Sequence, residues 1–320
     1  MKAWLVETLD QPPRLAELDR PVPGPGQALV RIAAAGLNFA DLLMAQGKYQ
    51  DRPALPFVPG LELAGTVQAL GLETAGPAPG SRVAAHVAGG AFAEYALVPA
   101  DRLLPLPDAM PMEHAAAFQV AYGTSHLALA VKAALAPGET LFVTGAAGGV
   151  GLTAVEIGRL LGARVIAQVR GPEKAALARA AGAEVVIDAD HPDPKGALRD
   201  LGGVDVAYDT VGGAGFDAIL RAMRPGGRML AIGFAGGEVP RVPLNQLLVR
   251  NVSVIGLWWG GYLNFAPQVL NRSLASLLDW YAAGRLHPHV SAVLPLAALP
   301  EGLEQIRSRR ATGKIVLRIG

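Results

Sequence analysis

A glycine-rich stretch that begins at Gly145 has the residue types needed to hold the phosphates of a nucleotide. It follows the apolar run Thr140–Thr144, and a segment with helical apolar spacing comes after it. Glycine permits a tight turn there and lets backbone N–H groups approach a pyrophosphate at the positive end of a helix. A glycine-rich turn alone is weak evidence in a chain with 39 glycines. Its place between a strand and a helix predicts a dinucleotide site over Ala147, Gly148, Gly149, Val150 and Gly151.

Two cations about 20 residues farther on bear on which dinucleotide is bound. Arg170 directly follows the expected strand Arg164–Val169, at the place where an acid would pair with the ribose hydroxyls of NAD, and Lys174 lies in the first turn of the next helix. Positive charge at both positions suits the 2′-phosphate of NADP. The alternative is that both cations are solvated and Glu173 is the ribose acid. We favour NADPH because Glu173 lies just inside the helix, after Pro172.

These residues need a parallel sheet to position them, and the chain contains one candidate. Up to about Ala100 the strand candidates are short and separated by Pro and Gly: Lys2–Glu7, Ala28–Ala33, Leu63–Leu70, Arg82–Val87 and Ala93–Val98. From about Leu103 onward six strand candidates alternate with helical stretches: Thr140–Thr144, Arg164–Val169, Glu184–Ile187, Val204–Tyr208, Arg228–Ile232 and Val252–Leu257. The sequence therefore predicts a small β-rich domain followed by a doubly wound parallel sheet.

The C-terminal part is ambiguous by periodicity alone. A helix is expected over Pro267–Ala283, and 287–320 reads as short strands flanking a helix over Leu299–Arg310. This tail could extend the parallel sheet or return to the first domain.

Composition narrows the function classes. With 320 residues, two domains are expected. Lys plus Arg number 28 against 27 Asp plus Glu, which argues against nucleic acid as a partner. The chain has no cysteine, so disulfides and Cys-ligated metals are excluded, and its six histidines are scattered or lie in an expected loop. No apolar run reaches the roughly 18 residues of a membrane span, and the N-terminus lacks a secretory signal, so we expect a cytoplasmic protein.

Several spaced motifs occur in an order that resembles one superfamily. They are Ala35-Gly36-Leu37-Asn38-Phe39-Ala40-Asp41, Gly47-Lys48-Tyr49, Pro56-Phe57-Val58-Pro59-Gly60-Leu61-Glu62-Leu63-Ala64-Gly65, Ala147-Gly148-Gly149-Val150-Gly151 and Thr312-Gly313-Lys314-Ile315-Val316. Together they span nearly the whole chain. The chain resembles the medium-chain dehydrogenase/reductase superfamily and, within it, the zinc-free quinone oxidoreductases.

The resemblance implies an α/β fold with two domains. Residues 1–99 and 270–320 would form a GroES-like β-rich catalytic domain, and residues 100–269 a Rossmann domain with a doubly wound parallel six-stranded sheet. The tail would thus return to the first domain. Members of this family usually form homodimers through the last Rossmann strand, here about Val252–Leu257. Zinc-dependent relatives have a ligand cysteine at the position of Asn38 and a ligand histidine at the position of Leu61. This chain has neither ligand, so no metal is expected.

The resemblance also implies site residues. Asn38, Asp41 and Tyr49 would face an interdomain cleft, where Asn38 could bond a quinone oxygen and Tyr49 could stack or donate. The alternative for each is a turn or capping role, above all for Asp41, because Asn38 to Asp41 reads as a helix start. For the cofactor, Thr124 would lie near the nicotinamide, Gly233 and Phe234 would receive its carboxamide, and Arg310 would reach toward a phosphate. A tyrosine common in the family is replaced by Asp188-Ala189-Asp190, which weakens the phosphate site.

The expected function is therefore an NADPH:quinone oxidoreductase that uses metal-free hydride or electron transfer on a small quinone or enone substrate. No residue stands out as a strong proton donor, which is compatible with a quinone. One alternative is an NADPH-dependent reductase of the C=C bonds of 2-alkenals or enoyl thioesters. Another is a non-catalytic NADPH-binding protein.

Overall fold

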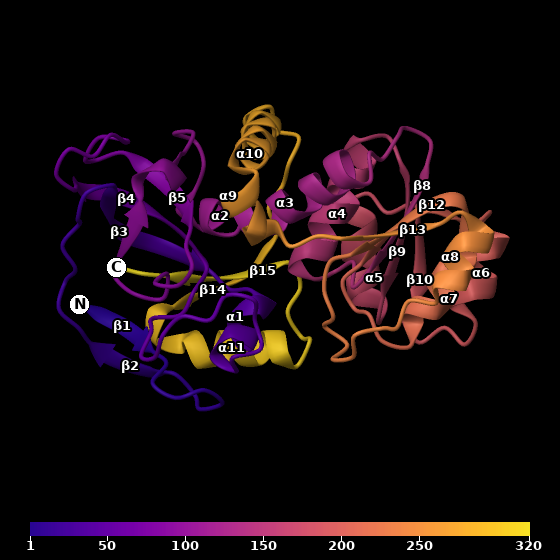
Figure 1. Ribbon diagram of the computed structural model, residues 1–320, viewed down its shortest axis with the longest axis horizontal. Coiled ribbons are helices and arrows are strands. Elements are labelled where there is room, and N and C mark those ends of the chain that lie inside the picture. Colours follow the sequence, from indigo (N-terminus) through magenta and orange to yellow (C-terminus); the bar gives the residue numbers. More distant parts are fainter. The chain divides into compact units, whose positions relative to one another are not determined.

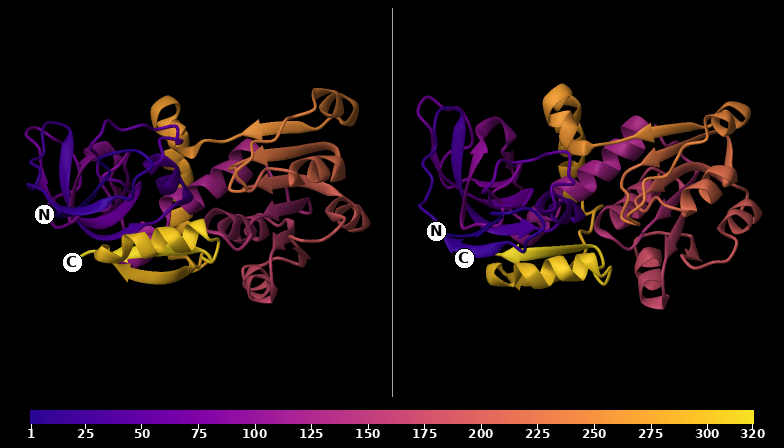
Figure 2. Two further views of the ribbon diagram at one scale, coloured as in Figure 1. Left: turned by 90° about the horizontal axis from the view of Figure 1, so that it is seen from below. Right: turned by 60° about the horizontal axis from the view of Figure 1, so that its bottom comes forward.

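A computed structural model describes all residues, 1–320, and divides them into two compact units. Unit 1 comprises Met1–Val120 and Pro288–Gly320, and unit 2 comprises Ala121–His287. Figures 1 and 2 show the arrangement of elements within each unit. None of the helices combines the length and the apolar character needed to cross a membrane.

Unit 1 is built around a mixed sheet in which every strand pairing but one is antiparallel. Its strands are β1 (Lys2–Leu5), β2 (Arg14–Glu17), β3 (Gln27–Gly36), β4 (Glu62–Leu70), β5 (Arg82–His86), β6 (Tyr95–Pro99), β7 (Leu104–Pro105), β14 (Val290–Pro295) and β15 (Lys314–Arg318). Its helices are α1 (Phe39–Ala45), α2 (Met112–Ala116) and α11 (Leu299–Arg307). Seven strands form one sheet in the order β14-β15-β3-β4-β5-β7, with β6 also paired to β3, and β1 pairs with β2 separately.

The C-terminal tail returns to unit 1, as the resemblance implies. The yellow strand β15 runs beside the indigo and purple strands in Figure 1, and it pairs antiparallel with β3. Its side chains Ile315 and Leu317 are buried with Ile32 and Leu63 in the core of this unit. The last strand is therefore an interior strand of the first sheet.

Unit 2 is a doubly wound parallel sheet. Its strands are β8 (Thr140–Thr144), β9 (Arg164–Val169), β10 (Val185–Asp188), β11 (Val204–Asp209), β12 (Met223–Ala231) and β13 (Ser253–Gly256). Its helices are α3 (Gln119–His126), which begins at the end of unit 1, α4 (Gly149–Leu160), α5 (Pro172–Ala180), α6 (Pro194–Asp200), α7 (Gly215–Ala222), α8 (Leu244–Arg250), α9 (Tyr262–Phe265) and α10 (Pro267–Ala282). The six strands are all parallel, in the order β10-β9-β8-β11-β12-β13.

The predicted fold class is confirmed, including six parallel strands and a GroES-like unit. Strand β8 is buried at every residue, which agrees with the apolar Leu141, Phe142 and Val143 between its two threonines. Helices α6 and α7 pack on one face of the sheet through Leu198, Phe216 and Leu220. The right-handed crossovers from β8 to β9 and from β9 to β10 place α4 and α5 on the other face.

The unit boundaries fall later in the chain than the predicted ranges. Helix α2 belongs to unit 1, because it packs on β3 so closely that a Cβ on Gly36 would lie 2.1 Å from the carbonyl oxygen of Ala116. Helix α10 belongs to unit 2, where Ser273 Oγ lies 2.8 Å from His126 Nδ1 and Trp280 contacts the His126 ring edge-on. Helix packing of this kind is not visible in the motifs that carry the resemblance from which the ranges were taken.

Candidate functional site

The glycine turn lies where a dinucleotide-binding sheet needs it. Gly145 leaves β8 with φ of 59° and accepts at its carbonyl from the Gly148 N–H at 2.9 Å, and α4 begins at Gly149. The predicted strand, turn and helix are thus confirmed. The chain enters this turn from β8, which lies between β9 and β11, so the turn is at the point where the strand order reverses.

The residues of this turn fit a pyrophosphate. A Cβ on Gly151 would lie 2.2 Å from the carbonyl oxygen of Gly145, so only glycine permits this approach of α4 to the turn. Gly148, Gly149 and Val150 are partly exposed. The first N–H groups of a helix have no partner within it, and they carry its positive dipole end. An accessible helix start with small side chains is the arrangement that binds phosphate oxygens.

Arg170 and Lys174 lie at the carboxyl end of the parallel strands, as the glycine turn does. Arg170 follows β9 directly, and Lys174 is in the first turn of α5. The Arg170 guanidinium donates from Nε and Nη2 to the two carboxylate oxygens of Asp190, each at 2.7 Å. This hydrogen-bonded pair raises the pKa of Arg170 and lowers that of Asp190. Sequence reasoning found the cation but not its partner.

The other predicted cofactor residues divide between the units. Thr124 is buried in α3, and Gly233 and Phe234 follow β12, with Phe234 40% exposed. The Gly233 N–H donates to the Asp209 carbonyl at 3.3 Å, which ties its turn to the end of β11. Arg310 lies after α11 in unit 1, where its Nε donates to Ser308 Oγ at 3.0 Å. Its contact with a cofactor phosphate stays a prediction.

A buried polar cluster in unit 1 surrounds Asn38. The first residues of β4 and β15, Glu62 and Lys314, both lie beside the end of β3, because Gly36 pairs with Glu62 and with Val316. Lys314 Nζ donates to Asn38 Oδ1 at 2.6 Å, to Glu62 Oε1 at 2.5 Å and to the Leu37 carbonyl at 2.7 Å. Asn38 Nδ2 donates to Glu62 Oε1 at 2.9 Å. The Asn38 amide is therefore held at both ends.

Glu62 and Lys314 are members of this cluster that sequence reasoning missed. Their side chains are 1% and 7% exposed, so the ion pair is removed from water. Glu62 Oε2 also accepts from the Val120 N–H at 3.1 Å. A signal was present, since each is a charged residue that directly precedes apolar residues of a strand, Leu63 and Ala64 after Glu62 and Ile315 to Leu317 after Lys314. Such a residue must be paired if the strand is buried.

Asp41 combines a structural and an electrostatic role. Its Oδ2 accepts from the Asn38 N–H at 2.7 Å, which confirms the expected helix start at α1. Burial raises the pKa of Asp41 to about 7, and the charge of Glu62 adds to this rise. The Asn38 N–H and the charge of Lys314 favour the ionised carboxylate and oppose the rise. A buried carboxyl that titrates near neutrality is a functional candidate.

The raised pKa of Asp41 predicts a pH dependence of stability. The folded chain holds this proton from about 3.8, the ordinary value, up to about 7, while the unfolded chain has lost it. The free energy of unfolding should therefore fall by about 1.4 kcal/mol per pH unit from this group across that window, and level off above it. Urea unfolding at a series of pH values measures the slope. In Asp41→Asn this component should vanish, and an unchanged slope would contradict the assignment.

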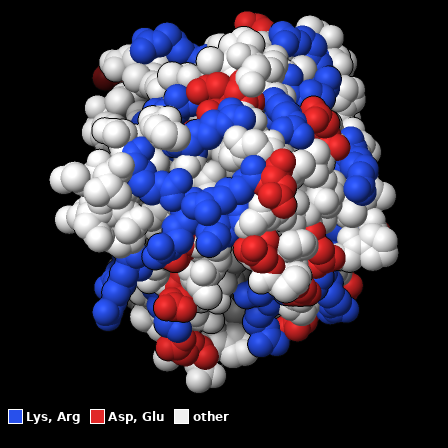
Figure 3. Space-filling view, turned by 90° about the vertical axis from the view of Figure 1, so that its right-hand side faces the viewer, with Lys and Arg blue, Asp and Glu red and all other residues white.

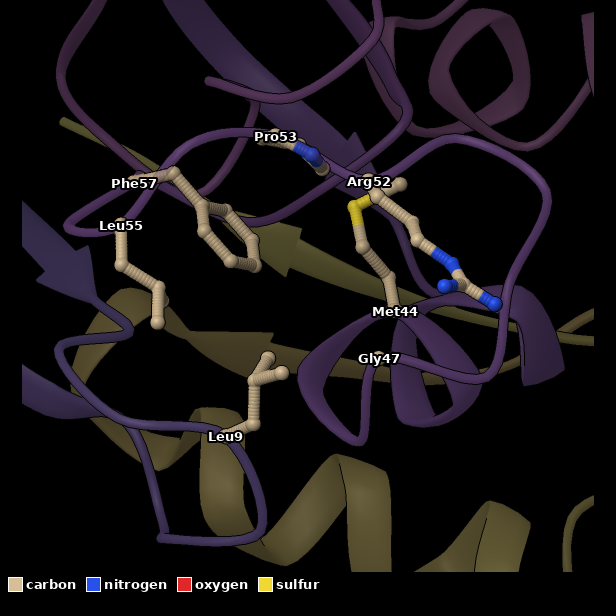
Figure 4. Close-up of a pocket in the computed structure, with 7 residues that line it drawn as sticks. All are labelled: Leu9, Met44, Gly47, Arg52, Pro53, Leu55 and Phe57. Carbon is tan, nitrogen blue, oxygen red and sulfur yellow. The ribbon is translucent and has the colours of Figure 1, made fainter.

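Tyr49 lies among apolar side chains of unit 1. It packs against the small cluster formed by Val6, Met44, Phe57 and Leu61. Met44 and Phe57 also line a cavity of about 250 Å³, shown in Figure 4, together with Leu9, Gly47, Arg52, Pro53 and Leu55. Arg52 brings the only charged group of this lining. The side chains of this cluster that Tyr49 packs against are thus all apolar.

No group of three or more His, Cys, Asp or Glu side chains is placed to hold a metal ion. Leu61, at the position of a ligand histidine in zinc-dependent relatives, is buried in the apolar cluster beside Tyr49.

On the face of unit 2 in Figure 3, basic side chains run across the middle with acidic side chains beside them. This mixture agrees with a net charge of +1.

Comparison with known proteins adds independent evidence. Residues 24–108 match the family model of the alcohol dehydrogenase GroES-like domain, and residues 149–276 match that of zinc-binding dehydrogenases. Quinone oxidoreductase-like protein 2 of Mus musculus is 36% identical over 99% of this chain and 91% of its own length. Prostaglandin reductase-3 of Bos taurus is 31% identical over 93% of this chain and 83% of its own.

A solved structure is similar over the full length. The quinone oxidoreductase from Thermus thermophilus, also solved in complex with NADPH, is 36% identical and covers 100% of both chains with a TM-score of 0.88. The sequence identity to these relatives, the coverage of both chains and the glycine turn at α4 all point to the same family. The chain therefore belongs to the quinone oxidoreductase-like proteins of the medium-chain dehydrogenase/reductase superfamily.

Proposed function

We propose that the chain is an NADPH-dependent oxidoreductase that reduces quinones without a metal. The observation that carries the proposal is the accessible glycine turn at the start of α4 with Arg170 beyond the neighbouring strand β9. Similar quinone oxidoreductases from Thermus thermophilus and Escherichia coli have been solved with NADPH. When bound, NADPH supplies the hydride.

Different residues of the chain would bind the cofactor and the substrate. Ala147, Gly148, Gly149, Val150 and Gly151 would hold the pyrophosphate, and Arg170 and Lys174 the 2′-phosphate. Thr124, Gly233 and Phe234 would orient the nicotinamide end, and Arg310 would add a phosphate contact. Asn38 and Tyr49 would recognise the substrate. Asn38 Nδ2 donates to Glu62 at 2.9 Å and makes a second, longer bond of 3.4 Å to the Gly36 carbonyl, and a substrate oxygen would replace this second bond.

A second candidate is the reduction of activated C=C bonds, and one observation favours it. This reaction must deliver a proton to the carbon beside the carbonyl, and Asp41, with its pKa raised to about 7 by burial, is partly protonated at neutral pH. The similarity to prostaglandin reductase-3 points the same way. Asp41 would then be the proton source that the sequence left unidentified.

One assay separates these functions. The purified chain is given NADPH with 1,4-benzoquinone or with a 2-alkenal, and oxidation of the cofactor is followed by absorbance. We expect turnover of the quinone that Asp41→Asn retains. Turnover of the alkenal alone, lost in Asp41→Asn, would establish the second candidate instead. Tight NADPH binding without turnover of any quinone or enone would favour a non-catalytic NADPH-binding protein.

We also propose that two copies associate through β13. This strand is at the edge of the unit 2 sheet and pairs only with β12, so its outer N–H and C=O groups can pair with a second copy. Helix α8, directly before it, has no buried residue and exposes Leu244, Leu248 and Val249 at 66–76%. Light scattering after size exclusion should give twice the chain mass of 33.1 kDa, and the mass of one chain would contradict the proposal.

A further inference from the structure

The ion pair between Arg170 and Asp190 lies where the 2′-phosphate of NADPH is proposed to bind. Arg170 follows β9, and Asp190 follows β10, the neighbouring parallel strand. Both oxygens of the carboxylate accept from the guanidinium at 2.7 Å, so one edge of the guanidinium plane is occupied. The two side chains are 61% and 63% exposed, which leaves the pair open to an incoming anion.

The backbone fixes Asp190 in this position. The Asp190 N–H donates to Asp188 Oδ1 at 2.8 Å, and the Ala189 N–H donates to the Val169 carbonyl at 2.8 Å. The segment after β10 is thus tied to the end of β9, the strand that carries Arg170. Asp188 also acts on Arg170 through its charge. Arg170 therefore faces two carboxylates before any nucleotide arrives.

A 2′-phosphate can meet Arg170 in two ways. A guanidinium has five N–H donors, and the pair uses two of them. The phosphate either displaces Asp190 or binds at the opposite edge with the carboxylate still in place. Asp190 opposes the phosphate in both cases, by competition in the first and by repulsion in the second. NADH has a neutral hydroxyl at this position and meets neither cost.

We propose that Asp190 is a specificity-determining residue that competes with the 2′-phosphate for Arg170 and so lowers the preference of this chain for NADPH over NADH. The proposal rests on the function proposed above and concerns the regulation of the same site. It assigns a function to the stretch Asp188 to Asp190, which stands where the family often has a tyrosine. An isosteric neutral side chain at Asp190 should leave the backbone contacts in place.

The test measures Kd for NADPH and for NADH by calorimetry in the parent chain and in Asp190→Asn. We expect the variant to bind NADPH about fivefold more tightly and NADH unchanged, the scale expected for loss of one exposed charge. In an Arg170→Ala background, adding Asp190→Asn should have no more than a small effect, because the competed group is gone. The matched control is Asp217→Asn, which removes one charge from another exposed ion pair of unit 2, that with Arg221.

Each other outcome overturns the inference. Weaker NADPH binding by Asp190→Asn would mean that the carboxylate holds Arg170 in place for the phosphate. Weaker NADH binding would make Asp190 a ribose ligand. An equal gain in Asp217→Asn would reduce the effect to net charge, and an unchanged NADPH Kd in Asp190→Asn would leave no competition. Failure of every chain, parent included, to bind either nucleotide would overturn the proposed function and the inference together.

Discussion

Replacing Lys314 by Met should lower the free energy of unfolding by about 3–5 kcal/mol, the cost of removing one partner from a buried ion pair. The variant leaves Glu62, whose side chain is 1% exposed, without its cationic partner, and it removes three hydrogen bonds at once. Met has a similar length and no charge, so the change in packing is small. Urea unfolding followed by circular dichroism measures the loss.

Two further variants test the cause of this loss. Adding Glu62→Gln to Lys314→Met should recover part of the stability, because no uncompensated charge is then buried. Arg318→Met, in the same strand β15, breaks the pair with Glu113, in which Arg318 is 64% exposed. This control should cost less than about 1 kcal/mol. Equal losses in Arg318→Met and Lys314→Met would show that burial of the pair is not the reason.

Gly149→Val should abolish NADPH binding while far-UV circular dichroism and most of the thermal stability remain. Gly149 is the first residue of α4 and is partly exposed, and its side of the turn is where a pyrophosphate would approach. A branched side chain there would hold the phosphate away from the helix N–H groups. NADPH binding measured by calorimetry, with a melting curve on the same sample, reports both properties.

Two other glycines serve as controls. Gly215 is the first residue of α7 in the same unit, and a Cβ there meets nothing within 4 Å. Gly215→Val should keep both fold and binding. Gly151→Ala should lower stability as well as binding, because its Cβ would lie 2.2 Å from the Gly145 carbonyl. NADPH binding by Gly149→Val as tight as that of the parent would place the phosphate site elsewhere.

Local patterns predicted much of the fold. Strands β8 and β9 were predicted with their observed bounds, because each is an apolar run that ends on a glycine or a charge. Ends that depend on tertiary pairing were predicted less well. Strand β12 begins at Met223, five residues before the expected Arg228, although Arg224, Pro225 and two glycines read as a loop. Its first pairing with β11 is separated from the rest by a register shift.

The candidate site was predicted where it depends on sequence neighbours and missed where it depends on pairing between distant strands. Asn38 and Asp41 are three residues apart, and their helix start was expected. Lys314 and Glu62 are 252 residues apart, and only the pairing of β15 and β4 with the end of β3 brings them together. In the same way Arg170 was predicted to bind the 2′-phosphate, but its partner Asp190 was missed because it lies beyond the next helix and strand.

The order of strands in unit 1 also sets the order in which the chain folds during synthesis. Strand β15 is an interior strand between β14 and β3, so the first sheet lacks two of its strands until Val290 to Arg318 have left the ribosome. The six strands of unit 2 are all made before residue 257, without interruption by unit 1. The parallel sheet can therefore form first. Until Lys314 is translated, 252 residues after Glu62, the Glu62 carboxylate lacks the lysine that pairs with it in the folded chain.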